Sequence, residues 1–222
     1  MLLKIKETFE LAIQKHQKND IKEAQELYNQ VLKINPNHSQ ALNNIAVIFT
    51  NLKNYQKAKE CYKKAIEINP DYQAAHNNLG TIFTNLKEYQ KAKECYKKAI
   101  KINPNYADAH YNLGNIFKSL RESQKAKNCY EKAIEINPNY SSAHYNLGVI
   151  YQGLGENQKA KECFEKAIKL KPDHLSAHKN LGILLKHKRL LSKIEQAKKS
   201  EIKTTISFFK KNQKKSHKSD LR

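Results

Sequence analysis

The sequence predicts an all-α protein in which short helices pair into a superhelical array of repeats. All five prolines stand 34 residues apart, and all four cysteines follow the same period. They are Pro36, Pro70, Pro104, Pro138 and Pro172, and Cys61, Cys95, Cys129 and Cys163. A constant period of about 20 to 50 residues is typical of a solenoid, in which each unit packs on its neighbours. Residues 48–70 and 82–104 differ at only two positions, which indicates a recent duplication.

Each unit is predicted to hold two antiparallel helices joined by a tight turn. In residues 73–106, one helix face is formed at spacings of three and four by His76, Leu79, Gly80 and Phe83. A second apolar face comprises Ala92, Cys95, Tyr96, Ala99, Ile100 and Ile102. The polar residues 87–89 connect the two helices, and Pro104 prevents the second one from continuing.

Glycine recurs in the middle of the first helix, where it costs about 1 kcal/mol relative to alanine. The four positions are Gly80, Gly114, Gly148 and Gly182, and Ala46 fills the same place in the first full unit. Because a small residue stands there each time, we expect a close approach of the partner helix.

The order of residue types in each unit is a bulky residue, Leu-Gly, an aromatic residue, and then Ala, Tyr or Phe, Ala and Pro. In residues 107–140 these are His110, Leu113, Gly114, Phe117, Ala126, Tyr130, Ala133 and Pro138. This pattern resembles the tetratricopeptide repeat family. The resemblance implies a right-handed α-α superhelix whose first helices line a concave groove.

The units are expected as follows. Residues 1–38 form a degenerate first unit, and the full units are 39–72, 73–106, 107–140 and 141–174. Residues 175–209 are expected to form a half repeat up to residue 188 followed by a capping helix, because a terminal repeat needs a solvated cover. Residues 210–222 lack an apolar pattern and are expected to be a disordered basic tail. Five two-helix units and a capping helix give about eleven to twelve helices in total.

Charge is distributed unevenly along the chain. The net charge is +20, from 41 Lys and Arg against 21 Asp and Glu. Residues 175–222 contain 14 basic and 3 acidic residues. This segment is either a solvated terminus or an electrostatic arm for nucleic acid, an anionic membrane or an acidic partner. The scarcity of arginine and of interleaved aromatic residues favours the solvated terminus and makes nucleic acid a less favoured partner.

Composition and spacing indicate no catalytic or cofactor chemistry. The cysteine spacing differs from that of zinc sites, so the cysteines are interpreted as small buried residues. The recurrent histidines are interpreted as packing residues or hydrogen-bonding partners of a neighbouring unit. We find no phosphate loop or catalytic motif and expect no enzyme, cofactor or metal. No apolar run approaches a membrane span and no secretory signal is evident, so a cytoplasmic protein is expected, with the nucleus as an alternative.

Asparagine occupies one position of every first helix. These residues are Asn44, Asn78, Asn112, Asn146 and Asn180. An amide offers both donors and an acceptor, so a row of amides could hold the backbone of an extended peptide. Alternatively, each asparagine caps or bridges to the next unit, or the row is a copy without a role. The row resembles the one that holds peptides in the repeats of the O-linked N-acetylglucosamine transferase family, whose catalytic region is absent from this sequence.

The remaining candidate residues flank that row. They are Asn43, Asn77, Tyr111, Tyr145 and Asn115, with the two tyrosines as possible aromatic anchors. The resulting hypothesis is a non-enzymatic scaffold that binds an extended peptide or a helix of a partner protein. Two alternatives are the peptide-presenting part of a glycosyltransferase and a nucleic-acid or membrane tether acting through the basic tail. The oligomeric state is left open by the sequence.

Overall fold

A computed structural model describes residues 2–219, and in it the side chains of residues 2–190, 192–196 and 198–203. The helices are α1 (Leu2–Gln17), α2 (Ile21–Ile34), α3 (Ser39–Asn51), α4 (Tyr55–Ile68), α5 (Gln73–Asn85), α6 (Tyr89–Ile102), α7 (Ala107–Ser119), α8 (Ser123–Ile136), α9 (Ser141–Gly153), α10 (Asn157–Leu170) and α11 (Leu175–Ser219). Between residues 2 and 219 there is no strand. The all-α prediction is confirmed.

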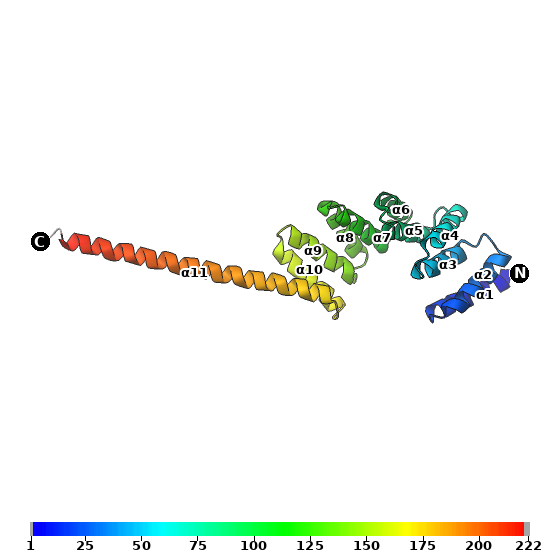
Figure 1. Cartoon of the computed structure of the whole chain (residues 1–222), viewed down its shortest axis with the longest axis horizontal. Helices are drawn as coiled ribbons and strands as arrows, with labels where there is room; N and C mark the ends of the chain where they lie inside the picture. The colour runs from blue at the N-terminus through cyan, green and yellow to red at the C-terminus, as the bar shows by residue number, and fades with distance from the viewer. Residues whose placement is uncertain (1, 220–222) are drawn as a thin grey trace.

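The helices form consecutive pairs along the long axis of the molecule (Figure 1). We call the first helix of each pair an A-helix (α1, α3, α5, α7, α9 and α11) and the second a B-helix (α2, α4, α6, α8 and α10). From α3 onward the A-helices begin at residues 39, 73, 107, 141 and 175, so the 34-residue period is a period of structure. Each B-helix packs against the A-helices on both sides of it.

An aromatic ring at the centre of each B-helix forms the core. These rings are fully buried and belong to Tyr28, Tyr62, Tyr96, Tyr130 and Phe164. A Cβ atom built at Gly80 would lie 2.7 Å from the Tyr96 ring. A Cβ atom built at Gly114 would lie at the same distance from the Tyr130 ring, and one built at Gly148 at the same distance from the Phe164 ring. The expected close approach therefore occurs at these three glycines. Gly182 differs, because nothing lies within 4 Å of a Cβ atom built there.

The turn from each A-helix to its B-helix contains one residue in the left-handed region. The residues are Asn19, Lys53, Lys87, Arg121 and Gly155, with φ between 57° and 76°. A residue in this conformation ends an α-helix and lets the chain reverse direction. Only the last turn uses glycine, so the other four have side chains at a position that disfavours them.

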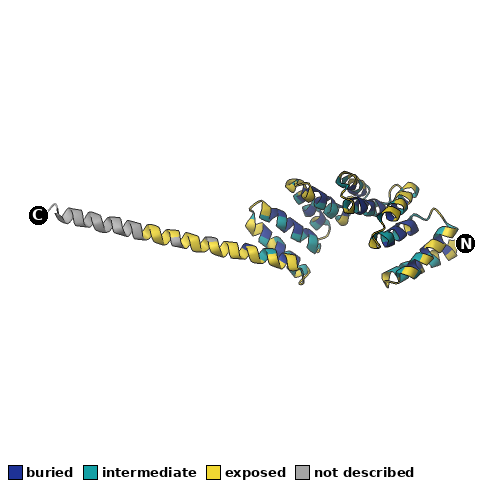
Figure 2. Cartoon of the chain, viewed as in Figure 1, coloured by how far each residue is buried: buried dark blue, intermediate teal, exposed yellow. Residues whose placement is uncertain are grey.

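The C-terminal segment differs from the expectation. A capping helix over 189–209 and a disordered tail over 210–222 were expected, but α11 runs without interruption to Ser219. Its first part covers α10, with Ala177 and Leu184 buried. Figure 2 shows that the following part projects away from the array, and its described side chains up to residue 203 are exposed. Neither proline nor glycine follows Gly182, and lysine, leucine and glutamate favour a helix. Residues 220–222 lie outside the described residues.

Candidate functional site

The asparagine row lies on the A-helices and bridges successive units. The Nδ2 atom of Asn78 donates to Oδ1 of Asn43 at 3.2 Å, and Nδ2 of Asn112 donates to Oδ1 of Asn77 at 3.0 Å. Asn43 and Asn77 are themselves buried. Each bond therefore joins one unit to the unit before it, as in the bridging interpretation of the row.

Bonds within the units connect these bridges into a continuous chain. Asn43 donates to Asn44 at 3.1 Å, and Asn77 donates to Asn78 at 3.4 Å. At its N-terminal end, Nδ2 of Asn44 donates to the hydroxyl of Tyr28 at 3.2 Å. The amides of α3, α5 and α7 are thus fixed in orientation by their neighbours, because each has a defined partner.

In the later units, a tyrosine hydroxyl replaces the asparagine oxygen as the acceptor of the bond between units. The Nδ2 atom of Asn146 donates to the Tyr111 hydroxyl at 3.2 Å, and that of Asn180 approaches the Tyr145 hydroxyl at 3.5 Å. The Tyr111 ring lies 4.8 Å from the Tyr140 ring, between ring centroids. Tyr111 and Tyr145 are half-buried in these contacts.

Asn115 and Lys118 extend the network at α7. Oδ1 of Asn115 accepts from the Tyr130 hydroxyl at 2.8 Å and from Nδ2 of Asn146 at 3.1 Å. The Lys118 ammonium donates to Oδ1 of Asn146 at 2.9 Å. Partial desolvation lowers the pKa of Lys118. The sequence indicated the ten candidate side chains, but it did not indicate these partners, because each depends on the packing of adjacent units.

The recurrent histidines also join successive units. The Nε2 atom of each lies 2.8–3.0 Å from the carbonyl oxygen of the proline six residues earlier. The pairs are His76 with Pro70, His110 with Pro104, His144 with Pro138, and His178 with Pro172. Since a carbonyl can only accept, Nε2 carries the proton. The hydrogen bond expected between neighbouring units is therefore present, because each proline ends the preceding unit.

The cysteines are half-buried and unpaired. Burial raises the pKa of Cys95, Cys129 and Cys163 each to about 11, so these thiols are protonated at neutral pH. A protonated thiol is a poor nucleophile and metal ligand. Within the described part of the chain, no group of three or more His, Cys, Asp and Glu side chains is placed to hold a metal ion.

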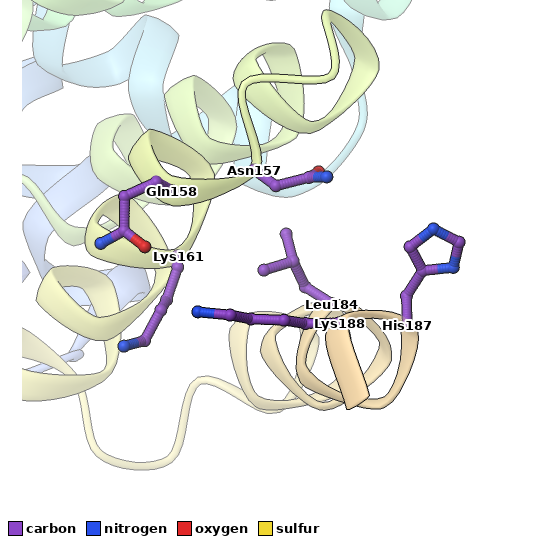
Figure 3. A pocket seen from close by; sticks show the side chains of 6 residues that line it. All are labelled: Asn157, Gln158, Lys161, Leu184, His187 and Lys188. Carbon is purple, nitrogen blue, oxygen red and sulfur yellow. The ribbon is translucent and has the colours of Figure 1, made fainter. Parts of the chain in front are cut away.

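A pocket of about 230 Å³ lies where α10 meets α11. Figure 3 shows Asn157, Gln158 and Lys161 on α10 facing Leu184 and Lys188 on α11, with His187 at the side. The lining is cationic around an apolar floor. The sequence pattern did not indicate this pocket, because it arises from the different packing of the last helix.

Comparison with known proteins identifies the repeat. Family models of the tetratricopeptide repeat match residues 39–72, 107–140 and 141–174, and other models of this repeat match 15–38, 61–94 and 80–120. The chain belongs to the tetratricopeptide repeat (TPR) family. No curated protein matches the sequence.

Several solved structures share the fold. MamA is 31% identical, with 72% of this chain and 94% of MamA covered at a TM-score of 0.62. YrrB, described as a TPR protein with an unusual peptide-binding site, is 23% identical, with 78% of this chain and 89% of YrrB covered at a TM-score of 0.60. PilF of Pseudomonas aeruginosa is 20% identical, with 83% of this chain and 91% of PilF covered at a TM-score of 0.70.

No helix of the described residues combines the length and the apolar character that crossing a bilayer requires.

Proposed function

We propose that this TPR protein is a non-enzymatic interaction scaffold that binds an extended segment of a partner protein along its A-helices. The observation that carries the proposal is the row of oriented, half-exposed amides at Asn44, Asn78 and Asn112. One N–H of each amide bonds to the preceding unit. The second N–H and the free lone pairs of oxygen remain for the alternating donors and acceptors of a peptide backbone.

The bridging bonds favour binding, because they fix the amides before a partner arrives. A rigid site loses less side-chain entropy on binding than a mobile one does. The bridging interpretation and the peptide-binding interpretation are therefore compatible. The description of YrrB as a peptide-binding TPR protein and the resemblance of the row to that of the transferase family support the same proposal.

The chemistry of the row favours a peptide over a nucleic acid. Its side chains are neutral amides and hydroxyls, and the Lys118 ammonium already donates to Asn146. A phosphate backbone is normally bound by several Lys and Arg side chains. A peptide backbone needs only the neutral donors and acceptors that the row supplies.

The test uses a peptide selected from a random twelve-residue display library against the full chain. We expect the double variant Asn78→Ala/Asn112→Ala to bind the selected peptide at least tenfold more weakly. N-methylation of alternate backbone amides in the peptide should weaken binding similarly, because it removes the donors that the row accepts.

The matched control is Tyr96→Phe. It removes a hydroxyl that lies 3.0 Å from the Thr84 hydroxyl and leaves the asparagine row intact, and Phe164 fills the equivalent position in α10. This control should bind the peptide like the unaltered chain, and circular dichroism should show intact helices in all variants. Binding that survives the double asparagine substitution would contradict the proposal.

A further inference from the structure

The first part of α11 is an A-helix that no B-helix follows within residues 2–219. In the three preceding units, the ring of a B-helix lies against the central glycine, at 2.7 Å from a Cβ atom built there. The corresponding glycine of α11 is Gly182, and among the described residues no atom outside its own helix backbone lies within 4 Å of a Cβ atom built there. The α11 backbone continues in a straight line where the other units turn back. The surface that a sixth B-helix would cover is therefore open.

The apolar side chains beside Gly182 are more exposed than their counterparts in the interior units, as an uncovered surface predicts. Phe83, Phe117 and Tyr151 occupy one position of successive A-helices and are each 8% exposed. Leu185 occupies that position in α11 and is 44% exposed. Ile183 is 52% exposed, and Leu181 is only half-buried. We call this apolar surface, formed by Leu181, Gly182, Ile183 and Leu185, the open end face.

Within the described residues, α11 does not turn back to cover this face. The ring position of α10 is Phe164, and the residue 34 positions later is Lys198. The buried Ala167 of α10 corresponds to Glu201. A lysine and a glutamate would be buried without the ring if this segment folded back as a B-helix, which is unfavourable. The open end face is thus available to another chain.

The interior units specify the shape of a fitting occupant. Every interior B-helix buries a small residue, an aromatic ring and a second small residue at positions i, i+4 and i+7. In α6 these are Ala92, Tyr96 and Ala99, which are 0%, 2% and 0% exposed. The small residues allow a close approach of the helices, and the ring fills the space above the glycine. A helix with this pattern would complete the open end face in the same way.

The surrounding charge specifies the chemistry of the occupant. Residues 175–203 contain eight Lys and Arg and two Glu. Lys186, Arg189 and Lys193 follow Gly182 at spacings of four, seven and eleven residues, so they lie on the same side of α11, and all three are exposed. Carboxylates of a partner would lie favourably beside these groups. A second copy fits poorly, because it is equally basic and its own B-helices are already buried.

We propose that the open end face is a docking site for an acidic amphipathic helix of another protein, which places a Tyr or Phe ring over Gly182. This site lies at the opposite end of the array from Asn44, Asn78 and Asn112, which carry the proposed peptide site, so it would recruit a second partner. It needs no rearrangement of the array, because the surface is already formed.

A synthetic helix provides the probe. It is a fluorescein-labelled, hydrocarbon-stapled peptide with the sequence of α10, Asn157–Leu170, in which the four lysines are replaced by glutamate. Titration of the full chain should give saturable binding by fluorescence anisotropy. Phe164→Ala in the peptide should weaken binding at least tenfold, because the ring is the central contact. The same peptide with its lysines retained should also bind at least tenfold more weakly.

Gly182→Leu in the full chain should abolish binding of the acidic peptide, because the new side chain occupies the place of the ring. The matched control is Gly153→Leu, since nothing lies within 4 Å of a Cβ atom at Gly153 either. It should bind the peptide normally. Both variants should retain their helices by circular dichroism, because both glycines have open space beside them.

Three results would overturn the proposal. The first is an acidic peptide that fails to bind or binds equally well after Phe164→Ala or Gly182→Leu. The second is a dimer of the full chain, seen by sedimentation, that Gly182→Leu dissociates, which would assign the face to a second copy. The third is binding to phosphatidylserine-containing vesicles that Gly182→Leu abolishes, which would assign it to a lipid surface.

Discussion

The interior junctions and the C-terminal end of the array use the same sequence motif with different results. Leu113-Gly114 in α7 and Leu181-Gly182 in α11 are identical pairs at equivalent positions. In α7 the pair packs against the Tyr130 ring, whereas in α11 the glycine has open space beside it. The difference teaches that the motif encodes a surface, and that the following B-helix decides whether this surface becomes core.

The largest expected difference between the two regions concerns the aromatic position of the A-helix. Phe117→Ala should lower the free energy of unfolding by about 3–5 kcal/mol, because a large buried side chain leaves a cavity. Leu185→Ala at the equivalent position should cost about 1 kcal/mol or less, because Leu185 is 44% exposed. Urea unfolding followed by circular dichroism measures both values. Equal losses would show that the end is as well packed as the interior.

Replacing the central glycine by alanine should change the stability of the protein in opposite directions in the two regions. Gly114→Ala should destabilise the protein by about 1–3 kcal/mol, because the new methyl group lies 2.7 Å from the Tyr130 ring. Gly182→Ala should stabilise α11 by up to about 1 kcal/mol, because alanine is the better helix former and no atom opposes it. Thermal unfolding of the two variants provides the comparison. A loss of stability in Gly182→Ala would mean that the open space is filled in solution.

The bridging amides should show a smaller difference. Asn112→Ala removes the 3.0 Å bond to Asn77 and leaves a buried amide oxygen without that donor, at a cost of about 1 kcal/mol. Asn180→Ala should lower the stability by only a few tenths of a kcal/mol, because Nδ2 of Asn180 lies 3.5 Å from the Tyr145 hydroxyl, which is long for a hydrogen bond. The midpoints of denaturant unfolding distinguish the two. Identical midpoints would remove the bridging role from Asn112.

The smallest expected effect comes from one substitution at two equivalent sites. Arg121 has φ of 60° at the turn between α7 and α8, so Arg121→Gly should stabilise the protein by about 0.5–1 kcal/mol. Arg189 stands 68 residues later inside α11, where Arg189→Gly should destabilise the local helix by up to about 1 kcal/mol. Amide hydrogen exchange around each site reports both signs. The same sign at both sites would show that α11 bends at residue 189.

The local parts of the fold could be predicted from the sequence, because they depend on periodicity and on breakers such as Pro104. All ten candidate side chains also lie on A-helices as expected. The partners of Asn78 and Asn112 could not be chosen among the alternatives, because they come from a neighbouring unit. The continuation of α11 was missed because a failed repeat pattern was interpreted as a break in the helix. The left-handed turn residues were missed because Lys53, Lys87 and Arg121 are unusual in that conformation.

The bridging bonds have a consequence for how this gene can change length. Each bond joins one position of a unit to a fixed position of the unit before it, 35 residues earlier in the cases of Asn78 and Asn112. Copying or deleting one whole unit re-creates the same hydrogen bond at the new junction, so no amide is left without a partner. The nearly identical segments 48–70 and 82–104 are the expected trace of such an event. The array can therefore lengthen or shorten by unequal recombination in steps of one unit without passing through an unfoldable intermediate.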